Sequence, residues 1–222
     1  MKRILLLLLV FYISTFNTEA QVSRITVDPA FKPFYHGVAS GDPQSDKVII
    51  WTRVTPDSGD IGDIKVNWQI ATDMAFTNVV SYGYDYVTED EDYTLKVDVC
   101  GLNPNRFYYF MFNALGKNSV VGRTKTAPDS NIDSLRFGIF SCSSYEDGYF
   151  NAYRDLVNRD DVDAVLHLGD YIYEYQASGA TVAGRVEEPA NEIISLNDYR
   201  TRYSHYRLDV DLQRLHQILP LS

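Results

Sequence analysis

The sequence has few positive charges, only two cysteines and no long apolar run after its N-terminus. Its 20 Lys and Arg residues are outnumbered by 30 Asp and Glu residues, which gives a formal net charge of −10. Phosphate backbones bind stripes of Lys and Arg, so this balance argues against a nucleic-acid partner. Hydrophobic residues make up 45% of the chain and charged residues 23%, which excludes a largely disordered protein.

The only long apolar stretch is N-terminal and has the parts of a secretory signal peptide. A basic pair, Lys2 and Arg3, precedes the apolar residues 4–13, and Ala20 supplies a small residue suited to cleavage. An uncleaved anchor is the alternative, but the run is shorter than the ~20 residues that span a bilayer. We therefore expect residues 1–20 to be removed, leaving a secreted or periplasmic protein without a transmembrane segment.

Export gives the two cysteines, Cys100 and Cys142, two alternative uses. In an oxidising compartment the simplest outcome is one disulfide between them. Alternatively the two thiols do unrelated jobs, because they lie in halves of the chain that differ in rhythm.

Residues 30–128 have the pattern of an all-β sandwich of the fibronectin III or immunoglobulin type. Leu95, Val97 and Val99 alternate with polar residues, which indicates a strand with one buried face. Gly, Asn, Pro and Asp clusters separate the strands, as in β-sandwiches. The clearest strand patterns are 47–54, 65–71, 94–100 and 107–114.

Two details of this half carry further expectations. Leu102, Pro104 and Tyr108 are spaced like the corner that leads into a late strand of fibronectin type III domains. The acidic run 89–92 is interpreted as a solvated loop.

After a polar linker, residues 134–222 alternate between strand and helix patterns, which implies a parallel sheet covered by helices. The apolar run 163–170 is of the kind that is buried on both faces of a sheet. Ser195 and Asp198 form a capping box before a helix. Leucines at helical spacing follow, with a break near Asp209. The other patterns are a strand at 135–142 and a helix at 148–159.

Chemically useful side chains follow both strand patterns. Cys142 ends the first strand and Asp170 the second, with Tyr173 three residues later. Carboxyl ends of parallel strands meet at one edge, so these groups are expected to converge there. Thiolate, carboxylate and phenolate together suit a hard or borderline Lewis-acidic metal. The alternative is structural, with Asp170 capping a turn and the tyrosines lining an apolar wall.

The histidines are interpreted structurally. His167, inside an apolar run, is expected to be a core histidine with its hydrogen bonds satisfied. His205 and His216 fall on helix patterns and are expected to be surface or packing residues.

The chain resembles PhoD-type alkaline phosphatases in four ordered blocks. These are "FYHGVASGDPQSDKVIIWTRVTP", "FGIFSCSSYEDGYFNAYRDL", "DAVLHLGDYIYEY" and "PANEIISLNDYRTRYSHYRLDVDLQRLHQILP". The resemblance implies a monomeric, exported hydrolase of phosphomonoesters and phosphodiesters that serves phosphate acquisition. It also implies that residues 134–222 are the first part of an α/β calcineurin-like metallophosphoesterase domain.

The resemblance further implies a site with iron(III) and calcium. Cys142, Asp170 and Tyr173 match the family's ligand positions, with Asp170 shared between metals. A metal-held hydroxide or oxide is the implied nucleophile, so no side chain is assigned as catalytic.

One departure from the family limits what we expect of this polypeptide. A motif close to Trp-Asp-Asp-His-Glu should follow the "LP" matched by Leu219 and Pro220, yet the sequence stops at Ser222. Residues 134–222 are thus expected to be a truncated domain that is inactive alone. The alternative function is a secreted β-sandwich binding module with a vestigial phosphatase half. Reading the coding sequence beyond Ser222 for that motif would discriminate the two.

Overall fold

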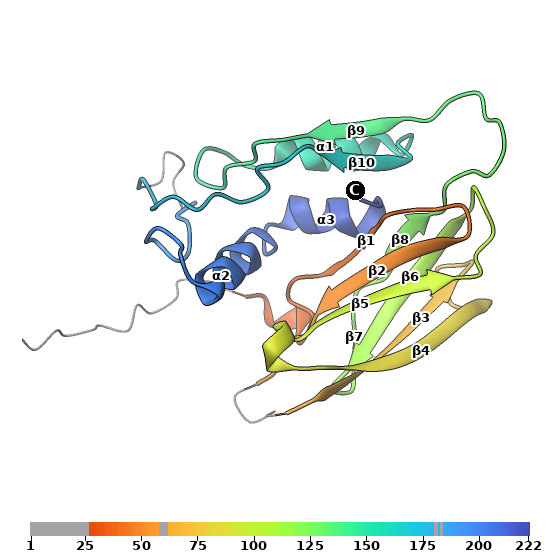
Figure 1. Cartoon of the computed structure of the whole chain (residues 1–222), viewed down its shortest axis with the longest axis horizontal. Coiled ribbons are helices and arrows are strands. Elements are labelled where there is room, and N and C mark those ends of the chain that lie inside the picture. The colour runs from red at the N-terminus through yellow and green to blue at the C-terminus, as the bar shows by residue number, and fades with distance from the viewer. Residues whose placement is uncertain (1–26, 58–61, 180–181, 183) are drawn as a thin grey trace, which may run out of the picture.

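The computed structural model describes residues 27–57, 62–179, 182 and 184–222, and Figure 1 shows two layered units. The signal peptide expected at 1–20 lies outside the described residues. Within the described residues no helix is long and apolar enough to cross a membrane.

Two antiparallel sheets form the first unit. One sheet has the strand order β1-β2-β5, and in the other β4, β3 and β6 follow one another, with β7 and β8 both pairing with β6. The strands are β1 (Val38–Gly41), β2 (Lys47–Arg53), β3 (Ile64–Ala71), β4 (Val79–Val87), β5 (Thr94–Cys100), β6 (Phe107–Ala114), β7 (Lys117–Asn118) and β8 (Gly122–Lys125). Short 3₁₀ turns, η1 and η2, span Pro29–Phe31 and Glu89–Glu91.

Alternation along the strands places the core between the sheets. Val48 and Ile50 of β2 face Phe110 and Phe112 of β6 in one buried cluster. Each such side chain contributes roughly 1.5–3 kcal/mol when fully buried. All four strands expected from the sequence are present within one residue of the expected bounds, and the structure is consistent with a β-sandwich.

The corner expected from the spacing around Tyr108 is also present. The buried Tyr108 hydroxyl accepts a hydrogen bond from the backbone N–H of Asn103 at 2.8 Å. This bond satisfies a phenol that would otherwise be buried without a partner.

The acidic run is only partly the solvated loop that we expected. Asp92 has left-handed backbone (φ 55°), and its carboxylate receives two hydrogen bonds from Arg53, at 2.7 and 2.9 Å. A planar guanidinium matches a carboxylate in this two-pronged way, which holds the end of the run against β2.

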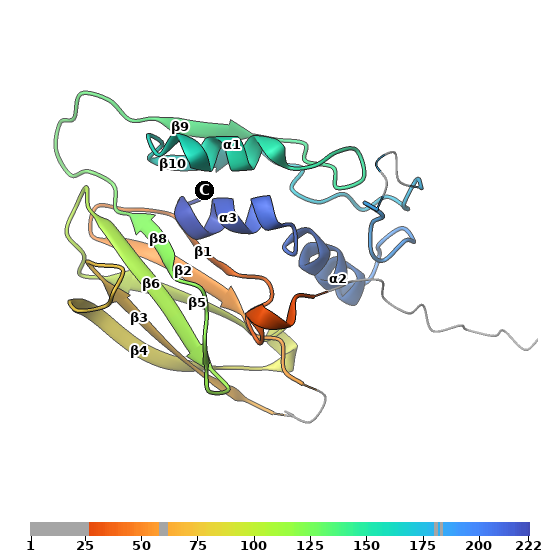
Figure 2. The same ribbon diagram turned by 180° about the vertical axis from the view of Figure 1, so that it is seen from behind.

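The second unit is a parallel pair, β9 (Phe137–Phe140) and β10 (Ala164–His167), with three helices. The helices are α1 (Asn151–Arg159), α2 (Leu196–Tyr206) and α3 (Val210–Ile218). Figures 1 and 2 show α1 and α3 beside the strand pair, and their apolar side chains share a buried cluster with Val165 of β10. Parallel pairing confirms the strand–helix–strand interpretation.

The expected burial of 163–170 on both faces holds for Ala164 and Val165 of β10 but not for the end of the run, and β9 is exposed on one face. Phe137 and Ile139 of β9 are 47% and 61% exposed, and Leu168 after β10 is 70% exposed. Gly138, between the first two, packs against Leu156 of α1. Helices therefore cover one face, and the other presents apolar side chains to solvent.

Local signals place the C-terminal helices as the sequence predicted. Ser195 and Asp198 form the capping box of α2. Asp209 breaks the helical run and caps α3, because its carboxylate accepts from two backbone N–H groups. His205 and His216 are buried, so packing was the correct interpretation and surface exposure was wrong.

Residues 220–222 join the two units into one sheet. Leu221 bridges Gly41 of β1 on one side and Val165 of β10 on the other, in parallel with both. The Leu221 N–H donates to the Ser40 carbonyl at 2.9 Å. A Cβ atom at Gly41 would lie 2.4 Å from the Leu221 carbonyl oxygen, so only glycine allows this approach.

Candidate metal centre

The segments after β9 and β10 are hydrogen-bonded to each other at one edge of the parallel pair. The Cys142 N–H donates to the Gly169 carbonyl, and the Ser143 N–H donates to the Asp170 carbonyl, both at 3.2 Å. These bonds fix the distance between the two strand ends. The prediction that β9 and β10 end at the same edge of the sheet is therefore confirmed.

Backbone conformation at this edge is unusual. Cys142 and Asp170 have φ values of 55° and 52°, in the left-handed region that L-residues rarely adopt. Such conformations cost about 1–3 kcal/mol each and cluster at functional sites. Gly169 has φ 118°, a value open essentially to glycine alone.

Two of the predicted donors, Cys142 and Tyr173, converge on one carboxylate oxygen of the third, Asp170. Asp170 Oδ2 accepts from the Cys142 thiol at 3.5 Å and from the Tyr173 hydroxyl at 3.3 Å. Sulfur, carboxylate and phenol therefore lie together without any rearrangement of the chain. In the described part of the chain no three His, Cys, Asp or Glu side chains form a group able to hold a metal. The present group contains only two such side chains, Cys142 and Asp170, because its third donor is the phenol of Tyr173.

The three tyrosines of this segment have different environments. Tyr171 points into the core, where its hydroxyl lies 2.9 Å from His216 Nε2. Tyr175 is 63% exposed and stacks on Tyr173, with ring centroids 6.2 Å apart. Only Tyr173 reaches Asp170, so the structure distinguishes one candidate ligand among three neighbours.

Electrostatics favour a cation at this point. Desolvation, followed by the Cys142 thiol and Asp170, raises the pKa of Tyr173 to about 12. Without positive charge nearby the phenol stays protonated at neutral pH, whereas a bound cation stabilises the phenolate. The donor set, which includes a thiolate, therefore fits a hard or borderline Lewis-acidic cation.

A cavity of about 790 Å³ lies elsewhere, on the sandwich, while one of about 370 Å³ adjoins these donors. Three carboxylates in the lining of the smaller cavity, Glu146, Asp147 and Glu187, were missed by the sequence interpretation. Glu146 and Asp147 lie at least 23 residues before Asp170, and Glu187 lies 17 residues after it. No local sequence pattern therefore connects these carboxylates with Asp170. The remaining lining residues are Cys142, Ser144, Tyr173, Tyr175, Gln176 and Ser178.

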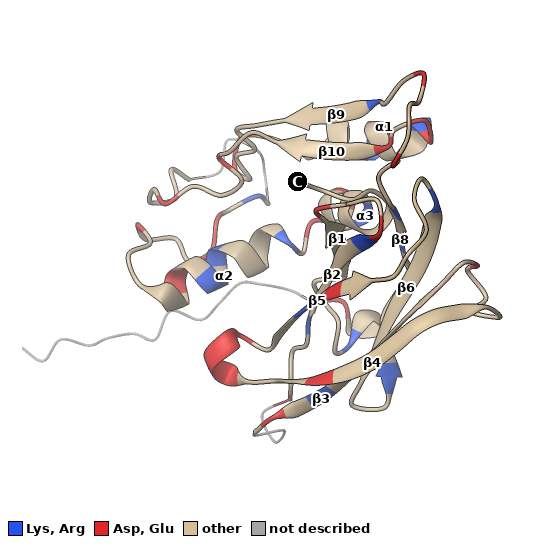
Figure 3. Cartoon of the chain, turned by 45° about the vertical axis from the view of Figure 1, so that its right-hand side comes forward, with Lys and Arg blue, Asp and Glu red and all other residues tan. Residues whose placement is uncertain are grey.

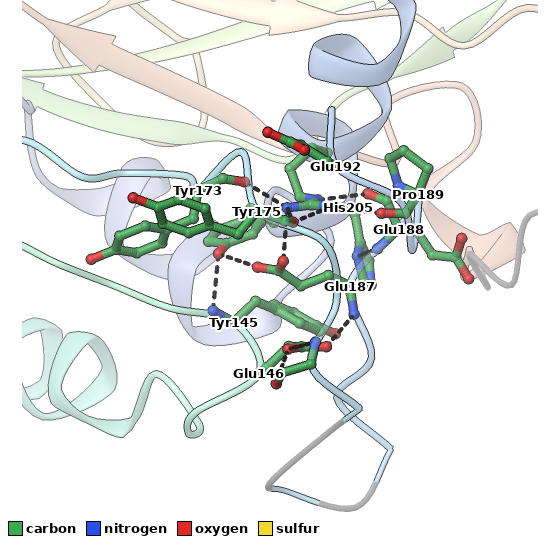
Figure 4. A network of polar contacts seen from close by, with 12 residues as sticks. Tyr145, Glu146, Tyr173, Tyr175, Glu187, Glu188, Pro189, Glu192 and His205 are labelled. Atoms are coloured by element: carbon green, nitrogen blue, oxygen red, sulfur yellow. Dashed lines mark hydrogen bonds and ion pairs between the residues drawn. The ribbon is translucent and has the colours of Figure 1, made fainter. Parts of the chain in front are cut away.

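Arg202 of α2 organises the loops behind this cavity. Its side chain is fully buried and forms an ion pair with Glu187 at 2.7 Å. The same guanidinium donates to the carbonyls of Tyr173 at 2.5 Å, Pro189 at 2.6 Å and Glu188 at 3.1 Å. Figure 4 shows how Tyr173, Glu187 and Glu188 gather in this network.

Glu187 is the acidic centre of the network. Its second oxygen accepts from the Tyr206 hydroxyl at 2.7 Å, while burial raises the pKa of its carboxyl. Arg202 thus ties the Tyr173 loop to the segment that carries Glu187. No sequence pattern indicates this role of Arg202, because backbone carbonyls are acceptors at every residue.

Only one of the two ring nitrogens of His167 has a hydrogen-bond partner among the described residues, contrary to expectation. Its Nδ1 accepts from the Gly169 N–H at 3.3 Å, but its Nε2 is buried without a hydrogen-bond partner among the described residues. Burial lowers the pKa of this imidazole, which favours the neutral form.

Both cysteines are free and exposed, so the disulfide alternative is absent from the structure. We expect mass spectrometry of non-reduced peptides to find Cys100 and Cys142 unlinked, because Cys142 is held beside Asp170 and Cys100 ends β5 of the sandwich. Alkylation of the native protein should label both thiols, and a Cys100→Ser variant should label only at Cys142. A linked peptide at high occupancy would contradict this assignment.

These features define a class, a β-sandwich protein whose following α/β unit brings a thiol, a carboxylate and a phenol together at a parallel strand edge. A family model described as the N-terminal domain of PhoD-like phosphatases matches residues 19–128, and a PhoD-like phosphatase model matches 137–222. The chain belongs to the PhoD-like phosphatase family.

Two relatives give the extent of the likeness. The chain is 40% identical over 197 residues to alkaline phosphatase D of Bacillus subtilis (strain 168), an alignment that covers 85% of this chain and 34% of that protein. It also matches a solved structure of PhoD with a TM-score of 0.79 and 36% identity, over 88% of this chain and 39% of the other. The chain thus spans about a third of the curated relative's length.

Proposed function

We propose that this chain is the first part of an exported, monomeric phosphoesterase that hydrolyses phosphomonoesters and phosphodiesters for phosphate acquisition. The convergence of Cys142 and Tyr173 on Asp170 carries the proposal. Family membership and the likeness to alkaline phosphatase D support it. Residues 30–128 act as the β-sandwich domain and 134–222 as part of a calcineurin-like metallophosphoesterase domain.

Cys142, Asp170 and Tyr173 would hold iron(III), with Asp170 shared with calcium. When bound, such ions stabilise negative charge that develops on a phosphoryl group. Glu146, Asp147 and Glu187 line the adjoining cavity, and Arg202 pairs with Glu187. Any of these carboxylates that keeps its charge would repel an anionic ester, so cations beside the cavity would favour binding of the ester.

The three donors do not suffice for two or more cations, because calcium alone takes 6–8 oxygen ligands. We therefore expect residues 21–222 alone to show no specific phosphodiester hydrolysis. The test compares this protein with a chimera in which residues 27–222 replace the matched segment of the Bacillus alkaline phosphatase D. Both proteins are supplied with iron and calcium, and release of a chromogenic alcohol is followed.

The chimera should hydrolyse the ester and lose this activity on Asp170→Asn, while the shorter protein stays at background. Circular dichroism of all three proteins controls for folding. Equal metal-dependent rates from the two wild-type proteins would refute the expectation for the shorter chain. Full activity of a folded Asp170→Asn chimera would refute the site.

Tyr173 provides a spectroscopic prediction. If its phenolate binds iron(III), the iron-loaded chimera shows a visible charge-transfer band that Tyr173→Phe abolishes. Tyr175→Phe is the matched control, since that ring stacks on Tyr173 but does not reach Asp170. Absorption spectra at equal iron content are compared. A band that survives Tyr173→Phe would assign the ligand elsewhere.

A further inference from the structure

The outer face of the larger sheet carries aligned aromatic and amide side chains. Tyr84 of β4 lies opposite Asn67 of β3, which lies opposite Asn113 of β6, and Asn118 of β7 follows. One row across four strands is therefore a tyrosine followed by three asparagines. The next row reads Tyr82, Gln69 and Met111.

These rows line an open groove with no charged side chain in its lining, although Lys65 lies beside it at Tyr84. The cavity of about 790 Å³ on the sandwich is lined by Asn67, Trp68, Gln69, Val79, Tyr82, Gly83, Tyr84, Met111, Phe112, Asn113 and Asn118. No lining residue is ionisable at neutral pH, although the chain has a net charge of −10. Figure 3 shows that the β4 ribbon is uncharged over most of its length.

Two tyrosines of β4 on this face are exposed to solvent. Tyr82 is 80% exposed and Tyr84 is 59% exposed, at a spacing of about 7 Å along the strand. Between them Gly83 lets the Trp68 ring approach the sheet, since a Cβ there would lie 2.8 Å from that ring. The Lys65 ammonium lies 3.9 Å from the centre of the Tyr84 ring and restrains it.

The amides have capacity to bind a ligand. Asn113 donates to the Asn118 oxygen at 2.7 Å, and among the described residues the Asn113 oxygen and the Asn118 nitrogen have no hydrogen-bond partner. Within the described residues no hydrogen bond engages the side chain of Asn67 or Gln69. Each carboxamide offers both donors and acceptors, which is what an array of hydroxyl groups requires.

The chemistry selects among occupants of the groove. An anionic polymer would be repelled by the net charge, and a cationic one would lack carboxylates in the lining. A second copy or a peptide strand pairing with the β4 edge would use the backbone rather than the amide rows. Flat aromatic faces beside neutral amides match a sugar ring, which has apolar C–H faces and a rim of hydroxyls.

We propose that this face binds an extended, uncharged polysaccharide, with Tyr82 and Tyr84 stacking on sugar rings and Asn67 and Asn113 bonding to hydroxyls. The site belongs to the sandwich and does not depend on phosphoesterase activity. Such a site would agree with the alternative function considered from the sequence, a secreted β-sandwich binding module.

The test is affinity electrophoresis of the full chain in native gels that contain hydroxyethylcellulose, glycol chitin, or neutral mannan, with polygalacturonate as the anionic comparison. Retardation by at least one neutral polymer is expected. A Tyr82→Ala/Tyr84→Ala double variant should weaken that binding at least tenfold, and Asn67→Ala several-fold. Tyr84→Phe, which keeps the ring, should retain most of it.

Tyr199→Ala is the matched control, because Tyr199 is 42% exposed on α2, away from the groove. Thermal unfolding confirms that each variant is folded. The proposal is overturned if no neutral polymer retards the wild type, or if retardation is unchanged in the double variant. It is equally overturned if sedimentation shows a dimer that Tyr84→Ala dissociates, since a second copy would then cover the groove.

Discussion

Replacing Arg202 with leucine is expected to lower the free energy of unfolding by about 3–5 kcal/mol, the usual cost of removing one partner of a buried ion pair. The guanidinium is fully buried and paired with Glu187. Without it, the Glu187 carboxylate and several backbone carbonyls stay buried and lose their donors. Burial already raises the pKa of Glu187, so the lone carboxyl would take up a proton at a still higher pH.

Urea unfolding of the two proteins measures this difference. Arg214→Leu is the control, because Arg214 is exposed on α3 and its one side-chain hydrogen bond among the described residues is to Gln217 at 3.3 Å. A change within ±0.5 kcal/mol is typical of such surface positions. Arg202→Lys should also be strongly destabilising, since one ammonium cannot reach the same set of carbonyls. A cost below about 1 kcal/mol for Arg202→Leu would show that the loops reorganise without the guanidinium.

The second large effect is a loss of stability in mild acid that originates at buried histidines. Burial, then the positive charges of Arg53 and Arg207, lowers the pKa of His36 to about 2. Burial, then Arg202 and Arg185, lowers the pKa of His205 to about 4. In the native state His36 Nε2 lies 2.6 Å from Ser204 Oγ, and His205 Nδ1 accepts from the Glu188 N–H at 3.0 Å.

The direction of the effect follows from proton binding. Below about pH 6.5 the unfolded chain protonates both histidines, whereas the native state does so only near their lowered pKa values. The unfolded state then binds more protons, so stability falls as pH falls. Each histidine contributes about 1.4 kcal/mol per pH unit, down to about pH 4 for His205.

Unfolding free energies measured between pH 4.5 and 6.5 test this prediction. His205→Gln keeps a hydrogen-bond acceptor but does not titrate, so its slope over this range should be shallower by about 1 kcal/mol per pH unit. His36→Gln should have a similar effect at the interface between the units. If both variants keep the wild-type slope, other groups control the acid response.

Much of the fold was predictable because its signals are local. Alternation in 94–100 identified β5, and the capping box at Ser195 identified the start of α2. The convergence of Cys142 and Asp170 followed from one topological rule, that parallel strands end at the same edge. Tyr173 was reached because it lies only three residues beyond Asp170.

The features that the sequence did not predict depend on contacts between residues that are distant in the sequence. Arg202 lies 29 residues from Tyr173, and its partners there are carbonyls that leave no mark in a sequence. The apolar run 163–170 matches a doubly covered strand, yet burial ends after Ala164 and Val165, because it is set by what packs on each face and not by composition. The bridge at Leu221 is too short to produce any periodicity, although it joins two sheets.

That bridge has a practical consequence for anyone who cuts the polypeptide. The connecting residues 129–136 are all exposed, so a protease can reach them. Cleavage there would leave Leu221 hydrogen-bonded to Ser40, and Arg207 bonded to the His36 carbonyl at 3.0 Å. The two pieces are therefore expected to co-elute on gel filtration after nicking. Separately expressed halves should reassemble on mixing, as in a split-protein reporter.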